Sequence, residues 1–299
     1  IEHRMSDLSN RVILTVAPTG SSTPAAKCPG LPVTPAEIAA ETYECWKAGA
    51  SVVHLHVRDD QGNASMEYEK FRESVALIRE KCDIVINMTT AGGFGVPDDE
   101  RILPLDLIPE MATMDAGSMN VKGDFVFHNS VAFLEKLGRR AQELGIRPEI
   151  EVMDTGMVYT ALRLIEQGYI KSPPHFQMVL GMENGMAATV ENLVYMKNLL
   201  PPGATWSAFG VGKAHLTILM ATLALGGHVR VGMEDNIYLD AGQKASSNVD
   251  FVERTRRIIE LNNKRPATPE ETRAMLGLRS RQACMDYALQ FSARPDRCG

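Results

Sequence analysis

Short apolar segments with the length of β-strands alternate with longer amphipathic segments through most of the chain. Eight segments are predicted as strands: residues 12–17, 52–57, 84–89, 111–115, 149–153, 175–180, 205–211 and 229–233. Between them, helices are predicted over residues 35–48, 68–80, 129–144, 158–167, 190–199 and 215–225. Eight strands that alternate with helices predict parallel strands closed into a (β/α)8 barrel, the TIM-barrel fold. An open doubly wound sheet is the alternative, which the lack of a Gly-rich dinucleotide-binding unit disfavours.

Two sequences mark the first turn of a helix. Residues 34–37 (Thr-Pro-Ala-Glu) and 268–271 (Thr-Pro-Glu-Glu) each place Thr before the helix and Glu three residues later, which is the pattern of a capping box. Proline at the first helical position loses only an N–H that has no partner inside the helix. We expect one catalytic barrel domain over residues 5–279, with Met5 as the natural start. The C-terminal extension over residues 280–299 is polar and basic, and we expect a loose or partner-docking tail.

Composition and charge exclude several classes of protein. Hydrophobic residues make up 44% of the 299 positions and the net charge is −6, so neither nucleic acid nor an anionic membrane is an expected partner. No apolar stretch is long enough to span a bilayer, and no signal-peptide pattern is present. The five cysteines form no Cys-x-x-Cys pair, which predicts reduced thiols in a cytoplasmic protein: Cys28, Cys45, Cys82, Cys284 and Cys298.

The interior of the predicted barrel is unusually polar. Because strand side chains alternate between faces, His54 and His56 point into the barrel while Val53 and Leu55 face the helices. The same parity directs further residues inward: Arg58, Asn87, Thr89, Thr113, Asp115, Glu149, Glu151, His228, Arg230, Gly232 and Glu234. An unpaired buried charge costs several kcal/mol, so such groups are expected to pair with each other, with a metal and with a ligand. Most lie toward the C-terminal strand ends, where barrel active sites are found.

The His54-Leu55-His56 sequence predicts a metal site. Two imidazoles on one side of a strand can converge on one ion, although such a pair can also simply satisfy each other or neighbouring acids. In a closed barrel the eighth strand neighbours the first and the first neighbours the second, so Glu234 can supply a third ligand. Two His and one Glu leave coordination positions open for catalysis. Zinc suits this set, and other divalent transition metals tolerate it.

Three further residues have both a structural and a functional interpretation. Asp235, directly after Glu234, is either a cap or a general base beside the metal. Arg230 either pairs with the acids or holds a carboxylate or Asp235 itself. Lys213 follows a Gly-rich turn after the seventh strand, where barrels commonly bind phosphate, although such a turn alone is a weak signal.

Several of these segments are similar to one known family. Residues 52–59 (VVHLHVRD), 89–93 (TTAGG) and 226–236 (GGHVRVGMEDN) resemble the β-keto acid cleavage enzyme family. The resemblance runs from about residue 12 to about residue 278 and takes in residues 31–35, 109–113 and 267–270. It implies a zinc-dependent transferase with the (β/α)8 fold, expected as a homotetramer. The implied reaction converts a β-keto acid and acetyl-CoA into acetoacetate and a new acyl-CoA.

The resemblance also implies roles for individual residues. It implies that His54, His56 and Glu234 bind zinc. It also implies that Asp235 acts as the base and that Arg230 assists Asp235. It makes Thr89, Gly92 and Thr113 contacts of the substrate, and we add Lys213 as a candidate for the CoA phosphates.

Ser22 departs from the pattern of family members that act on an aminated β-keto acid, which have Glu after the first strand. Because a serine cannot neutralise a buried ammonium group, we expect a neutral or otherwise different tail on the substrate, with Ser22 as a fourth substrate contact.

Two other classes of function are weighed against this one. A metal-dependent hydrolase of the amidohydrolase type also uses His-x-His in a barrel, but usually with further His ligands at later strand ends. Here His175 lies at the start of its predicted strand and His128 lies outside one. The second class is a non-catalytic binding or structural protein, in which the inward acids and the His pair would carry a desolvation cost without serving a function.

Overall fold

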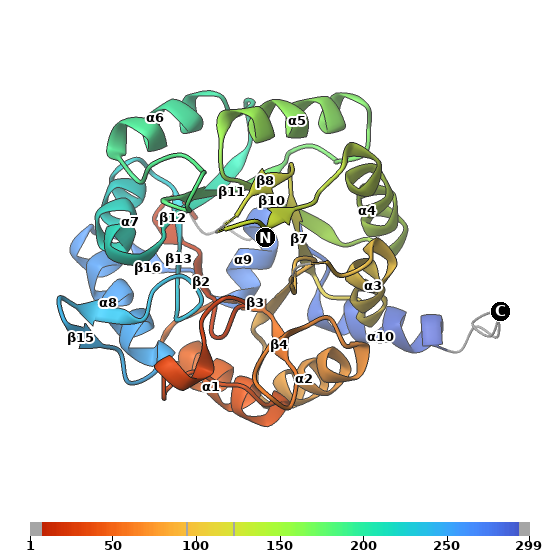
Figure 1. Cartoon of the computed structure of the whole chain (residues 1–299), viewed down its shortest axis with the longest axis horizontal. Helices are drawn as coiled ribbons and strands as arrows, with labels where there is room; N and C mark the ends of the chain where they lie inside the picture. The colour runs from red at the N-terminus through yellow and green to blue at the C-terminus, as the bar shows by residue number, and fades with distance from the viewer. Residues whose placement is uncertain (1–7, 94, 122, 293–299) are drawn as a thin grey trace, which may run out of the picture.

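The computed structural model describes residues 8–93, 95–121 and 123–292, and its centre is a closed barrel of parallel strands (Figure 1). The barrel strands are β2 (Leu14–Val16), β3 (Val52–Leu55), β6 (Val85–Met88), β7 (Met111–Asp115), β10 (Arg147–Val152), β11 (His175–Leu180), β12 (Thr205–Gly210) and β13 (His228–Val231). Closure is made by β13, which pairs in parallel with β2 so that Val229 lies opposite Leu14. The predicted (β/α)8 barrel is therefore confirmed, and the residues before Met5 lie outside the described part.

A ring of helices surrounds the barrel (Figure 1). Its members are α1 (Pro35–Ala48), α2 (Tyr68–Lys81), α4 (Val131–Leu144), α5 (Thr155–Glu166), α6 (Val190–Asn198), α7 (His215–Ala224) and α8 (Asn248–Leu261). Between β6 and β7 the chain instead forms a short helix, α3 (Asp98–Ile102), and a 3-10 turn, η2 (Leu103–Leu107). Helix α5 starts three residues earlier than predicted because the side chain of Asp154 accepts a hydrogen bond from the Met157 N–H.

The N-terminal end of the barrel is sealed. Helix α9 (Pro269–Leu276) begins at the predicted capping box of Thr268 and Glu271, and the box of Thr34 and Glu37 at α1 is present as well. A short pair of strands, β1 (Arg11–Val12) and β16 (Arg265–Pro266), holds the α9 segment against the barrel. Leu276 of α9 packs in a buried cluster with barrel residues. Because α9 closes the N-terminal end, a cavity in the barrel can open only at its C-terminal end.

The C-terminal segment, expected as a loose or partner-docking tail, is helical over residues 281–292. Helix α10 (Arg281–Ser292) follows α9, and Cys284 on α10 is buried in the same apolar cluster as residues of α4 and β10. Residues 293–299 lie outside the described part. The four cysteines within it are buried and free, as predicted: Cys28, Cys45, Cys82 and Cys284. In the part of the chain that the structure describes, no helix has the length and apolar character needed to cross a membrane.

Short elements decorate the connections between strands and helices. After β3 comes a hairpin of β4 (Val57–Arg58) and β5 (Ala64–Ser65), and after β7 one of β8 (Met119–Asn120) and β9 (Val126–Phe127). After β13 comes a hairpin of β14 (Tyr238–Asp240) and β15 (Gln243–Lys244). Single 3-10 turns, η1 (Ala25–Lys27) and η3 (Gly212–Ala214), follow β2 and β12. These connections leave the C-terminal strand ends, where loops of TIM barrels build active sites.

Candidate active site

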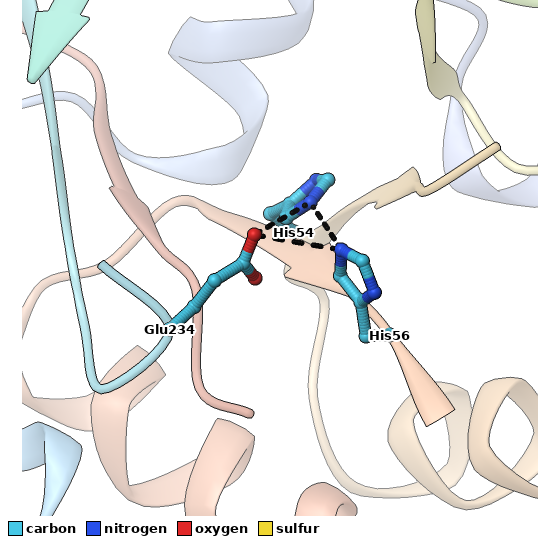
Figure 2. Close-up of side chains that lie close together, drawn as sticks. All are labelled: His54, His56 and Glu234. Carbon is cyan, nitrogen blue, oxygen red and sulfur yellow. Dashed lines mark hydrogen bonds and ion pairs between the residues drawn. The ribbon is translucent and has the colours of Figure 1, made fainter. Parts of the chain in front are cut away.

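Three side chains from two parts of the barrel converge at its C-terminal end (Figure 2). The Nε2 atoms of His54 and His56 lie 3.0 Å apart, and the Oε1 atom of Glu234 lies 3.4 Å from each. His54 belongs to β3 and Glu234 follows β13, and both strands pair with β2, which lies between them. The structure thus brings together the three residues that the sequence predicts as metal ligands.

The cluster fits a divalent metal ion. Ligands at about 2.0–2.1 Å from a tetrahedral ion lie roughly 3.3 Å from one another, close to the distances between these three atoms. Two imidazole nitrogens that face each other can share only one proton. The Oε2 atom of Glu234 is also buried, with no hydrogen bond among the described residues. A cation at this point satisfies all three side chains, and imidazole with carboxylate is a donor set for transition metals.

Two glycines let the loop that carries Glu234 lie against the end of β2. Gly20 has a φ of +57°, and a Cβ there would lie 2.4 Å from Cγ of Glu234. Gly232 has a φ of +145°, and a Cβ there would lie 2.1 Å from the carbonyl oxygen of Ala17. Any other residue at these positions would strain the backbone and collide with its neighbours. From the sequence alone, Gly232 is predicted only to be among the residues that parity directs inward.

Arg230 joins three carboxylates at the floor of the site. It donates from Nε to Oδ2 of Asp235 at 2.9 Å and from Nη2 to Oδ1 of Asp235 at 2.8 Å. It also donates to Oε1 of Glu234 at 2.7 Å and to Oε1 of Glu151 at 3.1 Å. Its guanidinium carbon lies 4.2 Å from the ring centre of Phe209. Of the interpretations left open by the sequence, the structure shows both for Arg230: it pairs with the acids and it holds Asp235.

Burial and charge set the protonation of these groups. Burial lowers the pKa of His56, which favours the neutral imidazole that a metal requires. Burial acts to raise the pKa of Glu234, but His56, Arg230 and His54 together hold it well below its ordinary value. Burial raises the pKa of Asp235 although Arg230 opposes it. A carboxylate with a raised pKa is a better proton acceptor near neutral pH than an ordinary one.

A small cavity of about 180 Å³ opens beside these residues. Of the four residues predicted to contact substrate, Thr89, Thr113 and Ser22 line it. The Thr89 hydroxyl accepts a hydrogen bond from the Ala91 N–H at 3.0 Å, and the Thr113 hydroxyl accepts one from the Thr90 N–H at 3.2 Å. Because each hydroxyl accepts from the backbone, its own hydrogen can be donated to a ligand oxygen.

Two predicted site residues lie outside the lining. Gly92 is not among the lining residues, although its neighbours Ala91 and Gly93 are. A Cβ at Gly92 would lie 2.7 Å from the carbonyl oxygen of Ser65, so glycine is needed here for the close approach of the β4–β5 hairpin. Lys213 is exposed in η3 and does not line the cavity.

Arg58, which parity pointed into the barrel, also lies outside the lining. It donates hydrogen bonds to the hydroxyl and the carbonyl oxygen of Thr19. The reason is that the barrel strand ends at Leu55 and the chain turns into the β4–β5 hairpin.

No site role was predicted for the apolar side of the cavity. That side comprises Val121, Phe127, Met153, Val179, Met182, Phe209 and Val211. Strand parity was a signal for part of it, because Met153 continues the inward positions of Glu149 and Glu151. Nothing in the pattern predicted the β8–β9 hairpin that brings Val121 and Phe127 to the cavity.

Comparison with known proteins places the chain in a family. A model of the beta-keto acid cleavage enzyme family matches residues 11–278. The 3-keto-5-aminohexanoate cleavage enzyme of Fusobacterium nucleatum is 42% identical over 273 residues, which are 91% of this chain and 100% of that protein. The 3-dehydrocarnitine:acetyl-CoA trimethylamine transferase of Rhizobium meliloti is 35% identical over 92% of this chain and 99% of that protein. The 3-oxoadipate:acetyl-CoA acetyltransferase of Cupriavidus necator is 35% identical over 90% and 95%.

Solved structures agree on the fold. The apo structure of ObcA superposes with a TM-score of 0.76 at 21% sequence identity, covering 84% of this chain and 66% of that chain. At that identity the likeness establishes the fold alone. The family match favours the β-keto acid cleavage predicted from the sequence over the hydrolase alternative. With a matched segment that spans nearly the whole barrel, the chain belongs to the beta-keto acid cleavage enzyme family.

Proposed function

We propose that this enzyme converts a β-keto acid and acetyl-CoA into acetoacetate and a new acyl-CoA, with a zinc ion held by His54, His56 and Glu234. The observation that carries the proposal is the position of Asp235, which Arg230 holds through both carboxylate oxygens beside the three candidate ligands. Two relatives with acetyl-CoA in their names, from Rhizobium meliloti and Cupriavidus necator, support the co-substrate. The keto acids in these two names differ, so family membership does not determine the tail of the keto acid.

The side chains around the cavity bind and orient the keto acid. When bound, a divalent metal supplies Lewis acidity that stabilises negative charge on the oxygens of the substrate. The hydroxyls of Thr89 and Thr113 can donate to the substrate carboxylate, since each already accepts a backbone hydrogen bond. Gly92 keeps the loop of Ala91 and Gly93 close to the β4–β5 hairpin and therefore at the edge of the cavity.

Asp235 is the proposed base. It takes a proton from C2 of the keto acid, and the carbanion attacks the acetyl carbonyl of acetyl-CoA, releasing the CoA thiolate. The thiolate then adds to the ketone carbon of the original acid, and the bond between that carbon and C2 breaks. Asp235 returns its proton to the departing carbon, which gives acetoacetate and the new thioester. No net proton is consumed, so one carboxylate suffices for both transfers.

Lys213 is the proposed contact of the CoA phosphates. It is exposed in η3 at the start of α7, close in sequence to Val211, which lines the cavity. The turn is fixed on the side of the reacting groups because the Gly212 N–H donates to the carbonyl oxygen of Asp235 at 2.9 Å. From the resemblance and the free cysteines we also propose a homotetramer in the cytoplasm.

The proposal is tested by measuring acetoacetate formation. Zinc-loaded protein with acetyl-CoA and a panel of β-keto acids is expected to form acetoacetate with at least one of them. Glu234→Ala and Asp235→Asn are expected to lose that activity, whereas Glu253→Gln on the exposed face of α8 keeps it. Protein that demonstrably contains metal and forms acetoacetate from no member of the panel would refute the proposal.

A further inference from the structure

The cavity has an apolar wall that the reaction chemistry does not use. We define the apolar wall as Val121, Phe127, Met153, Val179 and Met182. Val179 lies in β11, Met153 follows β10, and Val121 and Phe127 belong to the β8–β9 connection. In the closed barrel β11 is four strands from β3 in either direction. The part of the apolar wall that Val179 forms therefore lies across the barrel from His54.

The charged side chains of the cavity already have partners. The described titratable residues that line it are His54, His56, Asp115, Glu151, Arg230, Glu234 and Asp235. The one guanidinium among these described residues, Arg230, donates four of its five N–H groups to three carboxylates. Its positive charge is therefore already paired with more than one negative charge and does not favour an anionic tail. Glu151 and Asp235 are the acids that Arg230 holds, and Glu234 belongs to the ligand cluster.

The remaining polar lining offers no ionic partner to a substrate tail. Asp115 is almost fully buried on β7, where its carboxyl faces Glu151 and Arg101. Ser21 and Ser22, on the connection after β2, carry hydroxyls without charge. Each titratable group of the described lining thus belongs either to the reacting end or to the floor of the barrel.

The energetics of burial then select the tail. A charged group placed against the apolar wall loses its hydration without gaining an ion pair, which costs several kcal/mol. Each methylene group placed there instead removes apolar surface from water, which stabilises the bound substrate. The cavity of about 180 Å³ is small beside the roughly 300–1,000 Å³ of sites for drug-sized ligands. A tail of a few carbons is what this volume admits.

We propose that the substrate is a short β-keto acid with an uncharged, apolar tail that packs against the apolar wall. The inference rests on the proposed function and deepens it by naming the substrate class. The reacting carbons lie at His54, His56 and Glu234, and the tail extends across the barrel toward Val179. Met182, which also lines the cavity, contacts the tail.

The first test compares isosteric substrates on the zinc-loaded enzyme. 5-Methyl-3-oxohexanoate and 5-amino-3-oxohexanoate differ by a methyl against an ammonium group, and 6-methyl-3-oxoheptanoate and 3-oxoadipate differ by an isopropyl against a carboxylate group. In each pair kcat/KM for the neutral acid is expected to exceed that for the charged one at least tenfold. A charged acid that matches or exceeds its neutral partner overturns the inference but leaves the proposed function standing. Acetoacetate from none of the four is instead the failure of the proposed function.

The second test changes the wall itself. Met182 is half-buried at the cavity and is not part of the reacting end. For each variant we compare kcat/KM for 5-amino-3-oxohexanoate with kcat/KM for 5-methyl-3-oxohexanoate. The ratio of the first to the second is expected to be about tenfold higher in Met182→Glu than in Met182→Gln. Glutamine has the same shape as glutamate without the charge, so this control separates charge from packing. If both variants instead raise the KM for acetyl-CoA with every keto acid and leave the ratio unchanged, the wall seats the coenzyme and the inference is wrong.

Discussion

Arg230 binds both carboxylate oxygens of Asp235, from Nε at 2.9 Å and from Nη2 at 2.8 Å. This two-point contact fixes the plane of the carboxylate as well as its position. Because the same Nη2 also donates to Glu234 at 2.7 Å, the proposed base and a candidate metal ligand are held by one side chain. Arg230 therefore sets the spacing between the proposed base and this candidate metal ligand.

Replacing Arg230 with lysine tests this positioning. Arg230→Lys keeps a positive charge near the acids but cannot make the two-point contact. We expect kcat to fall about 100-fold, since a displacement of about 1 Å in a reacting group has that effect. Steady-state acetoacetate formation gives kcat and KM. Arg163→Lys on the exposed face of α5 is the control and should leave both unchanged. Wild-type kcat in Arg230→Lys would show that a single charge is enough.

Removing the metal is expected to lower stability as well as activity. Binding at a concentration about 100-fold above Kd stabilises the folded state by about 2.7 kcal/mol. For a protein of about 300 residues each kcal/mol shifts Tm by roughly 1.5–2 °C, so treatment with a chelator should lower Tm by about 4–5 °C. Added zinc should restore it. In Glu234→Gln the chelator should change Tm much less, because one candidate ligand is missing; an equal shift would place the metal elsewhere.

Local sequence rules predicted the barrel and the ligand cluster because both depend on short repeats. Parity along one strand put His54 and His56 on the same side, and closure of eight strands put Glu234 near them. The C-terminal helix was missed because the polar and basic character of residues 280–299 as a whole outweighed the apolar positions within residues 281–292. Cys284 is buried only through packing on distant elements, a tertiary contact that no local pattern reports.

Other misses were of different kinds. Helix α8 could have been predicted from Phe251, Thr255 and Ile259, which recur every four residues and are buried. The strands of the β8–β9 hairpin have two residues each, too few for a periodic signal, so Phe127 could not be placed at the cavity. Lys213 is a separate case: its contact with the CoA phosphates stays a prediction, because the general tendency of barrels to bind phosphate does not say which atoms face a ligand.

Gly20 is expected to be required for metal binding. A Cβ at this position would lie 2.4 Å from Cγ of Glu234, so Gly20→Ala must push the Glu234 side chain away from the two histidines. We expect metal affinity to fall about 10–100-fold, the range found when the support of a ligand is removed. Competition with a chromogenic chelator measures it.

The control for Gly20 separates strain from collision. Gly277 has a φ of +61°, close to the +57° of Gly20, but no atom within 4 Å of a built Cβ. Gly277→Ala therefore carries the same backbone strain, about 1–2 kcal/mol, without contact with a ligand. It should lower Tm and leave metal affinity unchanged. If both variants lose affinity equally, general destabilisation accounts for the effect of Gly20→Ala.

His228 is expected to make stability depend on pH. Burial lowers the pKa of His228 to about 3, and the charges of His175 and Lys264 act in the same direction. Its Nδ1 atom accepts a hydrogen bond from the Ile13 N–H at 3.1 Å, which a protonated Nδ1 could not do. The folded state therefore binds fewer protons than the unfolded state, in which a histidine titrates near 6.5.

His228 has a lower pKa in the folded state, about 3, than in the unfolded state, near 6.5, so it stabilises the protein more at high pH than at low pH. Above pH 6.5 the contribution of His228 to stability is complete, and it is lost progressively as the pH falls from about 6.5 toward 3. The loss is at most about 5 kcal/mol, at about 1.4 kcal/mol per pH unit. His228→Asn keeps an acceptor for Ile13 but cannot titrate. Denaturant unfolding at pH 7 and pH 5 should therefore show a smaller drop in the variant than in the wild type. Equal drops would mean that His228 is as easily protonated in the folded protein as in the unfolded chain.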